Sequence, residues 1–202
     1  MRLNDMSLET YMQKNLWDPL GIKNITFHSK RKPDVYKHLV HLTRRGPTDD
    51  KVHWTEGKYQ QDRNDVDDFG GGGAVGSATE YMKILQSICA NDGKLLTSEM
   101  IDEMFTPQLN VDAQKAFCQF KPLFSDSNVS KSNELGTTLN WGLGGLLLLS
   151  DEEAGVKGGT LSWGGLPNLF WTIDRGKGMS LFYAGNLLPY GDCKSREMEE
   201  LF

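Results

Sequence analysis

Four histidines, the residue type that most often binds metals or exchanges protons near neutral pH, all lie between residues 28 and 68. They are His28, His38, His41 and His53, and the His38-x-x-His41 spacing would place two imidazoles at neighbouring positions of a helix. No cysteine or glutamate accompanies them in a recognised ligand pattern. A solvated loop is therefore favoured over a metal site, and we expect no metal.

A glycine-rich run, Gly70 to Gly76, is the most unusual stretch in composition. The glycines at 71, 73 and 76 satisfy the G-x-G-x-x-G expression of dinucleotide-binding loops, but the residues before them, 63–68, are polar rather than a buried apolar strand. No Gly-Lys-Ser/Thr follows, which excludes a P-loop. The segment from Ser77 to Glu80 instead predicts a capping box and a helix start. A nucleotide-binding module remains the weakest of three hypotheses.

A serine nucleophile needs an adjacent base, which a third group must orient. The chain has no Gly-x-Ser-x-Gly elbow, and its one Ser-x-x-Lys, Ser29 to Lys32, lies in a basic, proline-flanked loop. We interpret this match as chance, because short expressions recur freely. Taken by themselves, the residues do not assemble a catalytic centre.

Two tryptophan-containing apolar runs flank a glycine cluster between Gly158 and Asp174, which includes Trp163-Gly164-Gly165-Leu166. A turn signal follows at 174–178, and a second apolar run extends from Met179 to Leu188. The pattern predicts an antiparallel hairpin whose strand edge borders a site.

The elements that would position these residues are helices in the first half of the chain and mainly strands in the second half. Helices are predicted from Ser7 to Leu16, from Ser77 to about Cys89, after Thr97 or Ser98, and over 194–202, with one buried strand over 138–149. The hydrophobic periodicity weakens over 108–138. Residues 28–68 are predicted to form a long loop excursion with one short strand at most. This order predicts an α+β fold, an antiparallel sheet with flanking helices, in a single domain over residues 1–202.

Composition narrows the class of protein. The chain has 202 residues, of which 38% are hydrophobic, and a formal charge of −5, which argues against nucleic acid as a partner. Three widely spaced cysteines indicate neither a disulfide framework nor a zinc site. No apolar run approaches the ~20 residues of a membrane span, and no signal peptide is evident. We expect a cytoplasmic chain without a membrane partner, and both ends read as truncated.

Several motifs, in order, resemble the C-terminal part of the serine β-lactamase-related family, which includes class C β-lactamases, esterases and fungal acyltransferases. The first is the predicted helix at 7–16 with its Trp17-x-Pro-Leu-Gly-hydrophobic turn. The second is the glycine run with Ser77, in which Gly76 departs from the family pattern. The segment 95–107 and the aromatic-Gly-Leu-Gly strand at 141–144 follow.

The resemblance gives Trp163-Gly164-Gly165 a role, because it is similar to the family's third active-site motif in the form found in esterases and acyltransferases. It implies that the backbone amide of Leu166 is an oxyanion donor beside Gly165, and that Trp163 and Gly164 border the acyl substrate. The implied activity is acyl transfer, by an acyltransferase, transesterase or esterase, from a small-molecule ester or thioester through an acyl-serine intermediate, in fungal secondary metabolism. The implied partners are a small-molecule acyl donor and acceptor, with an acyl carrier as a further candidate and no cofactor.

The chain also departs from the family pattern at the catalytic motifs. The nucleophilic Ser-x-x-Lys of the family and its tyrosine motif lie upstream of the Pro-Leu-Gly turn, where this chain has only 18 residues. The expected fold is therefore a partial β-lactamase/transpeptidase-like fold that lacks its N-terminal part. A catalytically inactive remnant, or a protein of this fold that binds a small molecule or partner, is the alternative.

Overall fold

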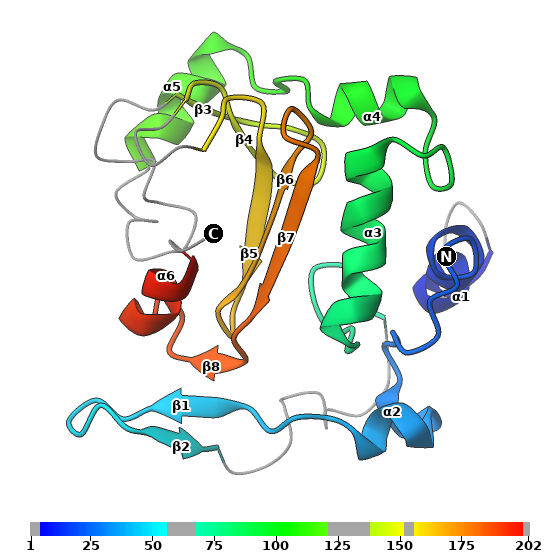
Figure 1. Cartoon of the computed structure of the whole chain (residues 1–202), viewed down its shortest axis with the longest axis vertical. Helices are drawn as coiled ribbons and strands as arrows, with labels where there is room; N and C mark the ends of the chain where they lie inside the picture. The colour runs from blue at the N-terminus through cyan, green and yellow to red at the C-terminus, as the bar shows by residue number, and fades with distance from the viewer. Residues whose placement is uncertain (1–4, 56–67, 121–137, 152–155, 200–202) are drawn as a thin grey trace. The chain divides into compact units, whose positions relative to one another are not determined.

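The computed structural model describes residues 5–55, 68–120, 138–151 and 156–199 (Figure 1). The chain forms two compact units, residues 1–84 and 85–202, which are described separately. Helix α3, Ala78–Ala90, contributes residues to both units. The prediction of a single domain over 1–202 stays a prediction.

The first unit consists of short elements joined by turns. They are helix α1 (Leu8–Met12), the π-helix η1 (Gln13–Trp17), the 3-10 helix η2 (Ser29–Arg31), helix α2 (Pro33–Lys37) and the antiparallel strands β1 (Thr43–Arg45) and β2 (Val52–Trp54). Ser7 caps α1, as predicted, by accepting a hydrogen bond from the Thr10 amide at 3.1 Å. The expected excursion therefore contains a two-stranded hairpin instead of at most one strand, and its residues 56–67 lie outside the described part of the chain.

The core of the first unit forms around the turn that ends η1. Trp17, Ile22 and Ile25 are buried there, with Phe27 and Ile84 packed against them. In η1 the hydrogen bonds span one residue more than in an α-helix. Tyr11, in the preceding helix α1, is 40% exposed, whereas Trp17 at the end of η1 is fully buried.

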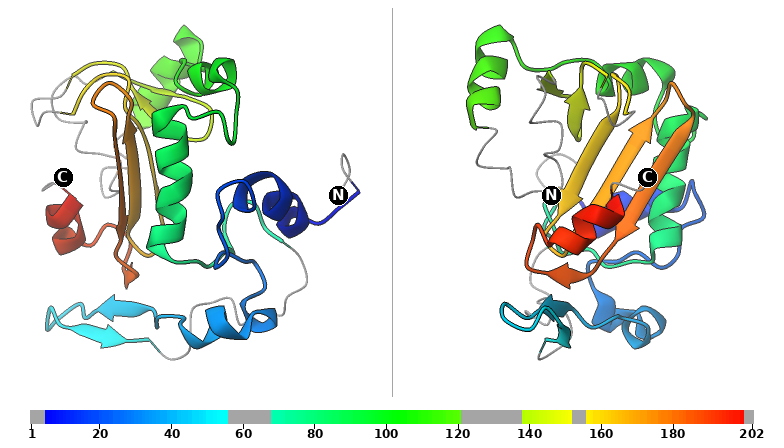
Figure 2. Two further views of the ribbon diagram at one scale, coloured as in Figure 1. Left: turned by 45° about the vertical axis from the view of Figure 1, so that its right-hand side comes forward. Right: turned by 60° about the vertical axis from the view of Figure 1, so that its left-hand side comes forward.

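The second unit is an antiparallel sheet with helices, which confirms the predicted fold class. The sheet has the order β3-β4-β5-β6-β7, and Figure 2 shows α6 and the part of α3 from Leu85 onward on opposite faces of it. Its strands are β3 (Leu139–Trp141), β4 (Leu146–Leu148), β5 (Leu161–Gly165), β6 (Leu169–Asp174) and β7 (Met179–Ala184). The short strand β8 (Leu187–Leu188) follows β7 in the chain and is not part of this sheet. The helices are α4 (Ser98–Met104), α5 (Val111–Phe120) and α6 (Cys193–Glu199).

The predicted hairpin over the last apolar runs is confirmed, since β6 and β7 pair from Leu169–Ala184 to Asp174–Met179. The single strand predicted over 138–149 is wrong. Gly144, at φ +93°, reverses the chain between β3 and β4, and the Gly142 amide donates to the Gly145 carbonyl at 3.0 Å. Few residues other than glycine adopt such a φ, so the glycines convert one apolar run into two paired strands.

Helix α5 was not predicted, although it packs against the sheet. Phe117 lies against the buried side chains Leu139, Leu146 and Leu148. Gln114 donates to the Leu139 carbonyl at 3.0 Å, and Asn140 bonds both backbone groups of Leu109. These contacts hold α5 and the residues just before it against β3.

The end of α3 carries an acidic residue whose ionisation supports the fold. A hydrogen bond from the buried Ser87 hydroxyl at 2.7 Å, together with contacts from Lys94, lowers the pKa of Asp92 to about 2. Because the folded pKa lies below the ordinary value, the stabilisation is present above about pH 4 and is lost as the pH falls toward 2. We therefore expect Asp92→Asn to reduce the loss of stability of the chain between pH 4 and pH 2, measured by urea unfolding at several pH values. An unchanged pH dependence would contradict this role.

Candidate functional site

The candidate site is the end of the β5–β6 hairpin. Trp163 pairs with Trp171, Gly164 with Phe170 and Gly165 with Leu169, and a three-residue turn, 166–168, joins the strands. Asn168 closes this turn at φ +53°, the left-handed position that three-residue hairpin loops place last. Leu166 and Trp163 are exposed by 56% and 39%, so both face solvent at this end of the sheet.

Asn168 fixes the turn from inside the unit. Its fully buried side chain donates to the Leu187 carbonyl at 2.7 Å and to the Pro189 carbonyl at 2.8 Å, and it accepts from the Gly191 amide at 2.8 Å. The backbone of the same turn accepts from Gly185 and Leu187. Asn168 was not predicted from the sequence, although an asparagine directly after a proline in a short hairpin loop is a recognisable left-handed position.

Close backbone packing favours glycine at position 164. A Cβ at this position would lie 3.0 Å from the Leu169 carbonyl oxygen, which is tighter than ordinary contact. A Cβ at Gly165 would lie 3.4 Å from the Leu169 side chain, which is tolerable. Packing therefore constrains position 164 more tightly than position 165.

Trp163 belongs to a row of aromatic side chains along this side of the sheet. Its ring centroid lies 4.8 Å from that of Trp141, which lies 5.9 Å from that of Phe117 on α5. Aromatic pairs at such distances add roughly 0.5–1.5 kcal/mol beyond their buried area. Trp141 is partly exposed and packs directly against Trp163. Phe117 was missed together with its helix.

The glycine run of the first unit packs closely against the chain before it. Val75 and Thr26 exchange two backbone hydrogen bonds at 2.9 Å, and a Cβ at Gly76 would lie 2.7 Å from Cγ1 of Ile25. Packing thus accounts for Gly76 without a ligand.

Only half of the predicted capping box forms. The Ser77 hydroxyl accepts from the Glu80 amide at 3.3 Å, but the Glu80 carboxylate binds the backbone amides of Lys23 and Asn24 and the Lys83 ammonium. Burial opposes ionisation of Glu80, yet these hydrogen bonds outweigh it and lower the pKa of its carboxyl group. Glu80 therefore ties the start of α3 to the turn that follows η1.

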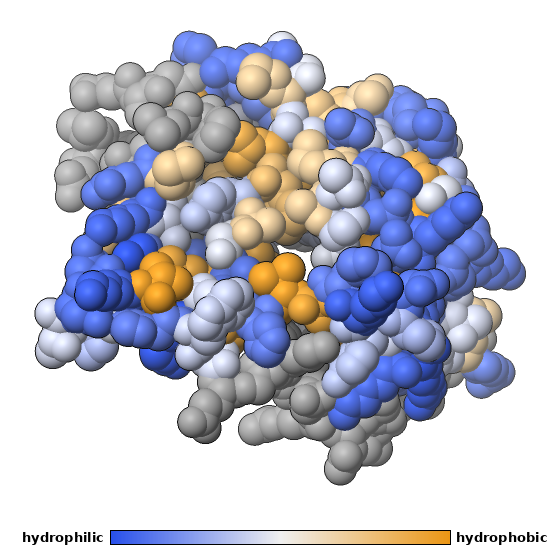
Figure 3. Space-filling model, turned by 60° about the horizontal axis from the view of Figure 1, so that its bottom comes forward, coloured by the Kyte–Doolittle hydropathy of each residue, from blue (hydrophilic) through white to orange (hydrophobic). Residues whose placement is uncertain are grey.

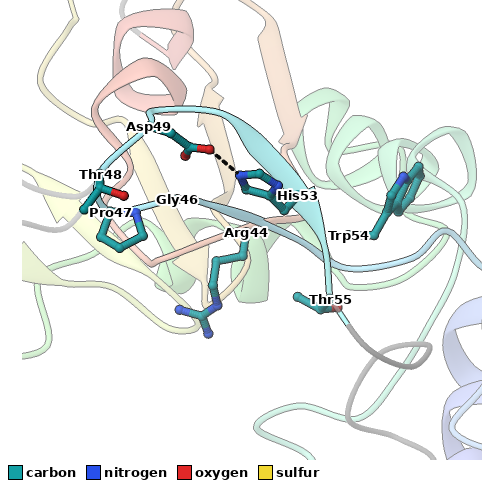
Figure 4. A pocket seen from close by; sticks show the side chains of 8 residues that line it. All are labelled: Arg44, Gly46, Pro47, Thr48, Asp49, His53, Trp54 and Thr55. Atoms are coloured by element: carbon teal, nitrogen blue, oxygen red, sulfur yellow. Dashed lines mark hydrogen bonds and ion pairs between the residues drawn. The ribbon is translucent and has the colours of Figure 1, made fainter.

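The histidines of the predicted loop lie in different environments. His38 bonds the Asp34 carbonyl through Nδ1 at 2.7 Å, whereas His41 contacts the edge of Trp54, so the His38–His41 spacing forms no ligand pair. His53 bonds Asp49 at 2.9 Å beside a surface hollow of the β1–β2 hairpin (Figure 4). A hydrogen bond from the Lys51 amide, reinforced by His53, lowers the pKa of Asp49.

His28, by contrast, lies beside two carboxylates that are distant from it in sequence. Its Nε2 atom lies 2.8 Å from Asp68 and 4.0 Å from Glu9. Within the described residues, these three side chains are the group whose geometry could hold a metal ion.

Ser29 and Lys32, the residues of the Ser-x-x-Lys match, have structural contacts in the first unit. Ser29 is buried at the start of η2. The Lys32 ammonium lies 3.2 Å from the Ile25 carbonyl, 3.8 Å from Glu9, and 5.6 Å from the centre of the Trp17 ring. These contacts hold Lys32 against the core of the first unit.

Comparison with known proteins decides the family. Residues 2–198 match the family described as Beta-lactamase. The chain belongs to the beta-lactamase family. Monacolin J acid methylbutanoyltransferase of Aspergillus terreus is 30% identical over 204 residues, which cover all of this chain and 49% of that protein. Lovastatin esterase of Penicillium rubens is 34% identical over 176 residues, or 86% of this chain and 44% of the relative.

A solved structure of a beta-lactamase-family relative agrees with this membership. The LovD6 mutant of simvastatin synthase (LovD) from Aspergillus terreus superposes with a TM-score of 0.87 at 31% identity, over all of this chain and 49% of that one. The chain thus spans about half the length of the relatives it matches and corresponds to their C-terminal part. The predicted resemblance and the partial fold are confirmed.

No described helix is long and apolar enough to cross a bilayer. On the face shown in Figure 3, hydrophobic residues occur in several groups within a mainly hydrophilic surface.

Proposed function

We propose that this chain supplies one wall of an acyl-transfer site. The observation that carries the proposal is the Trp163-Gly164-Gly165-Leu166 strand end, fixed by Asn168, in a chain whose relatives are named as acyltransferases and an esterase. The Leu166 amide is the proposed oxyanion donor, with Gly165 leading the backbone into the turn. Trp163 and Gly164 form the proposed surface for the acyl group.

In the proposed reaction, a serine oxygen attacks the carbonyl carbon of an ester or thioester and displaces its alcohol or thiol. An acceptor alcohol or water then attacks the acyl-serine and releases the serine. Each attack places negative charge on the carbonyl oxygen, and a backbone amide aimed at that oxygen contributes about 3 kcal/mol to lowering the barrier. The Ser-x-x-Lys of the family is not at its motif position in this chain, so we assign the nucleophile to residues outside these 202.

The proposed substrates are a small-molecule acyl donor and a small-molecule acceptor, within fungal secondary metabolism. The relatives' names motivate this class, because one denotes transfer of a methylbutanoyl group and another hydrolysis of an ester. An acyl carrier is a further proposed form of the donor. The partly exposed aromatic row from Trp163 to Phe117 offers an apolar acyl group a surface of the right kind.

A non-catalytic binding protein of the same fold is the second candidate, favoured by the missing Ser-x-x-Lys and tyrosine motifs. The two candidates differ in what happens when those motifs are restored. A catalytic half becomes active, whereas a binding protein does not.

The test joins this chain to the N-terminal half of the Aspergillus terreus relative. We expect p-nitrophenyl ester and acyl-thioester turnover from the joined protein and none above the buffer rate from the chain alone. Turnover by the chain alone would place a nucleophile within it. An inactive but folded joined protein would favour the binding alternative, provided that the relative's own two halves, joined in the same way, are active.

The oxyanion assignment is tested by a pair of substitutions at one position of the joined protein. Leu166→Pro removes the amide hydrogen, and we expect kcat to fall roughly 100-fold. Leu166→Ala keeps the amide and is expected to retain kcat within a few-fold. Equal losses in both variants, at unchanged melting temperature, would show that the side chain and not the amide is required.

A further inference from the structure

We propose that Glu9, His28 and Asp68 of the first unit form a binding site for one divalent transition-metal ion, with Zn²⁺ as the ion that the ligand set suits. The three residues come from α1, the turn before η2 and the segment before α3. All three belong to residues 1–84, so the site is complete within one compact unit. It is independent of the proposed acyl-transfer function.

The spacing of the ligand atoms fits a small four-coordinate ion. One nitrogen or oxygen from each residue lies within 4.8 Å of the other two. His28 Nε2 lies 2.8 Å from Asp68 Oδ1 and 4.0 Å from Glu9 Oε2. Ligands bound tetrahedrally to zinc at about 2.0 Å lie about 3.3 Å apart, between those two distances. To reach that spacing, the His28–Asp68 distance would lengthen by about 0.5 Å and the His28–Glu9 distance would shorten by about 0.7 Å. Water would be the fourth ligand.

The backbone and a hydroxyl already orient the two carboxylates. Asp68 accepts the Glu9 amide through Oδ2 at 2.7 Å. Glu9 accepts the Thr26 hydroxyl through Oε1 at 2.6 Å and the Phe27 amide through Oε2 at 2.7 Å. Hydrogen bonds to metal-binding carboxylates are the usual means by which proteins hold such ligands in place. The arrangement therefore exists before any ion binds.

The Asp68 side chain is only 7% exposed, and its Oδ1 atom accepts no hydrogen bond from the residues that the structure describes. That oxygen is turned toward His28 Nε2. A buried carboxylate oxygen without a donor is costly unless a positive charge compensates it. A cation bound between Asp68 and His28 would supply this compensation.

Lys32 does not fill the position between the three ligands. Its ammonium lies 3.8 Å from Oε1 of Glu9, whereas Oε2 is the oxygen nearest His28. The side chains of His28 and Glu9 are 14% and 17% exposed, so an ion can enter from solvent.

The test is a zinc titration of the metal-free chain by isothermal calorimetry and mass spectrometry. We expect one Zn²⁺ per chain and a rise in Tm. The conservative variants Glu9→Gln, His28→Gln and Asp68→Asn should each weaken binding by at least about tenfold. His53→Gln is the matched control: His53 also bonds an aspartate at 2.9 Å, but the pair has no third ligand among the described residues, and affinity should be unchanged.

A second measurement does not depend on the variants folding. Co²⁺ added to the natural chain should give the visible absorption of a four-coordinate ion without a thiolate-to-cobalt band, because none of the ligands is a cysteine. Absence of zinc binding, a cobalt–thiolate band, or equal affinity in His28→Gln and His53→Gln would each overturn the proposal.

Discussion

Replacing Asn168 with aspartate is expected to lower the free energy of unfolding by about 4 kcal/mol. This is one of the two largest effects on stability that we predict for a single substitution. The asparagine amide donates to the Leu187 and Pro189 carbonyls from a fully buried position. Aspartate would place a carboxylate oxygen against both carbonyls, where no described cation neutralises it. Urea unfolding followed by tryptophan fluorescence measures the loss.

Asn110→Asp is the matched control for this substitution. Asn110 is exposed, and its side-chain oxygen accepts the Ala113 amide at the start of α5, a role that aspartate fills equally well. We expect a change within about 0.5 kcal/mol there. A loss below about 1 kcal/mol for Asn168→Asp would mean that the turn does not depend on this side chain.

Asn168 also bears on function, because it closes the turn that contains Leu166. If Asn168 fixes that turn, Asn168→Gly should speed hydrogen exchange at the Leu166 amide more than at amides of Leu161 or Ile173 in the same sheet. A uniform increase across all three positions would indicate general destabilisation instead.

Gly142→Ala is the second substitution with a large expected effect. A Cβ at Gly142 would overlap the Met104 carbonyl group and lie 2.9 Å from Cδ1 of the fully buried Leu161. The Met104 carbonyl accepts the Leu143 amide at 3.0 Å, so moving it away also weakens the link between α4 and the β3–β4 turn. We expect a loss of about 3 kcal/mol in the free energy of unfolding.

Gly176→Ala serves as the comparison for Gly142→Ala. Gly176 lies in the exposed β6–β7 turn, and a Cβ there would approach only the side-chain oxygen of Asp174, at 3.3 Å. This variant should change stability by no more than about 0.5 kcal/mol. If both glycine substitutions behaved alike, close packing at Gly142 would not be the cause.

The parts of the fold that sequence predicts well are those with strong local signals. The β6–β7 hairpin follows from two apolar runs around a turn-forming segment, and the α1 start follows from Ser7. Helix α5 was not predicted. The contacts of Gln114 and Asn140 that join its segment to β3 depend on a strand far along the chain.

The residues of the candidate site likewise fall into those that the sequence predicts and those that it does not. The Trp163-Gly164-Gly165-Leu166 strand end could be predicted because its residues are contiguous and match a family motif. Asn168, Phe117 and the Glu9–His28–Asp68 group could not, because their importance depends on residues between 19 and 59 positions away, or on an unpredicted helix. Pairings across such distances arise only once the fold has formed.

Labelling with a fluorophosphonate, followed by intact-mass and peptide analysis, tests the central claim most directly. This claim is that the chain carries an oxyanion and acyl-binding wall without the nucleophile. Labelling is done on the chain alone and on the chain joined to the N-terminal half of its Aspergillus terreus relative. The account predicts no adduct on the chain alone and one adduct on a serine of the added half in the joined protein. A stoichiometric adduct on any serine of these 202 residues would contradict it.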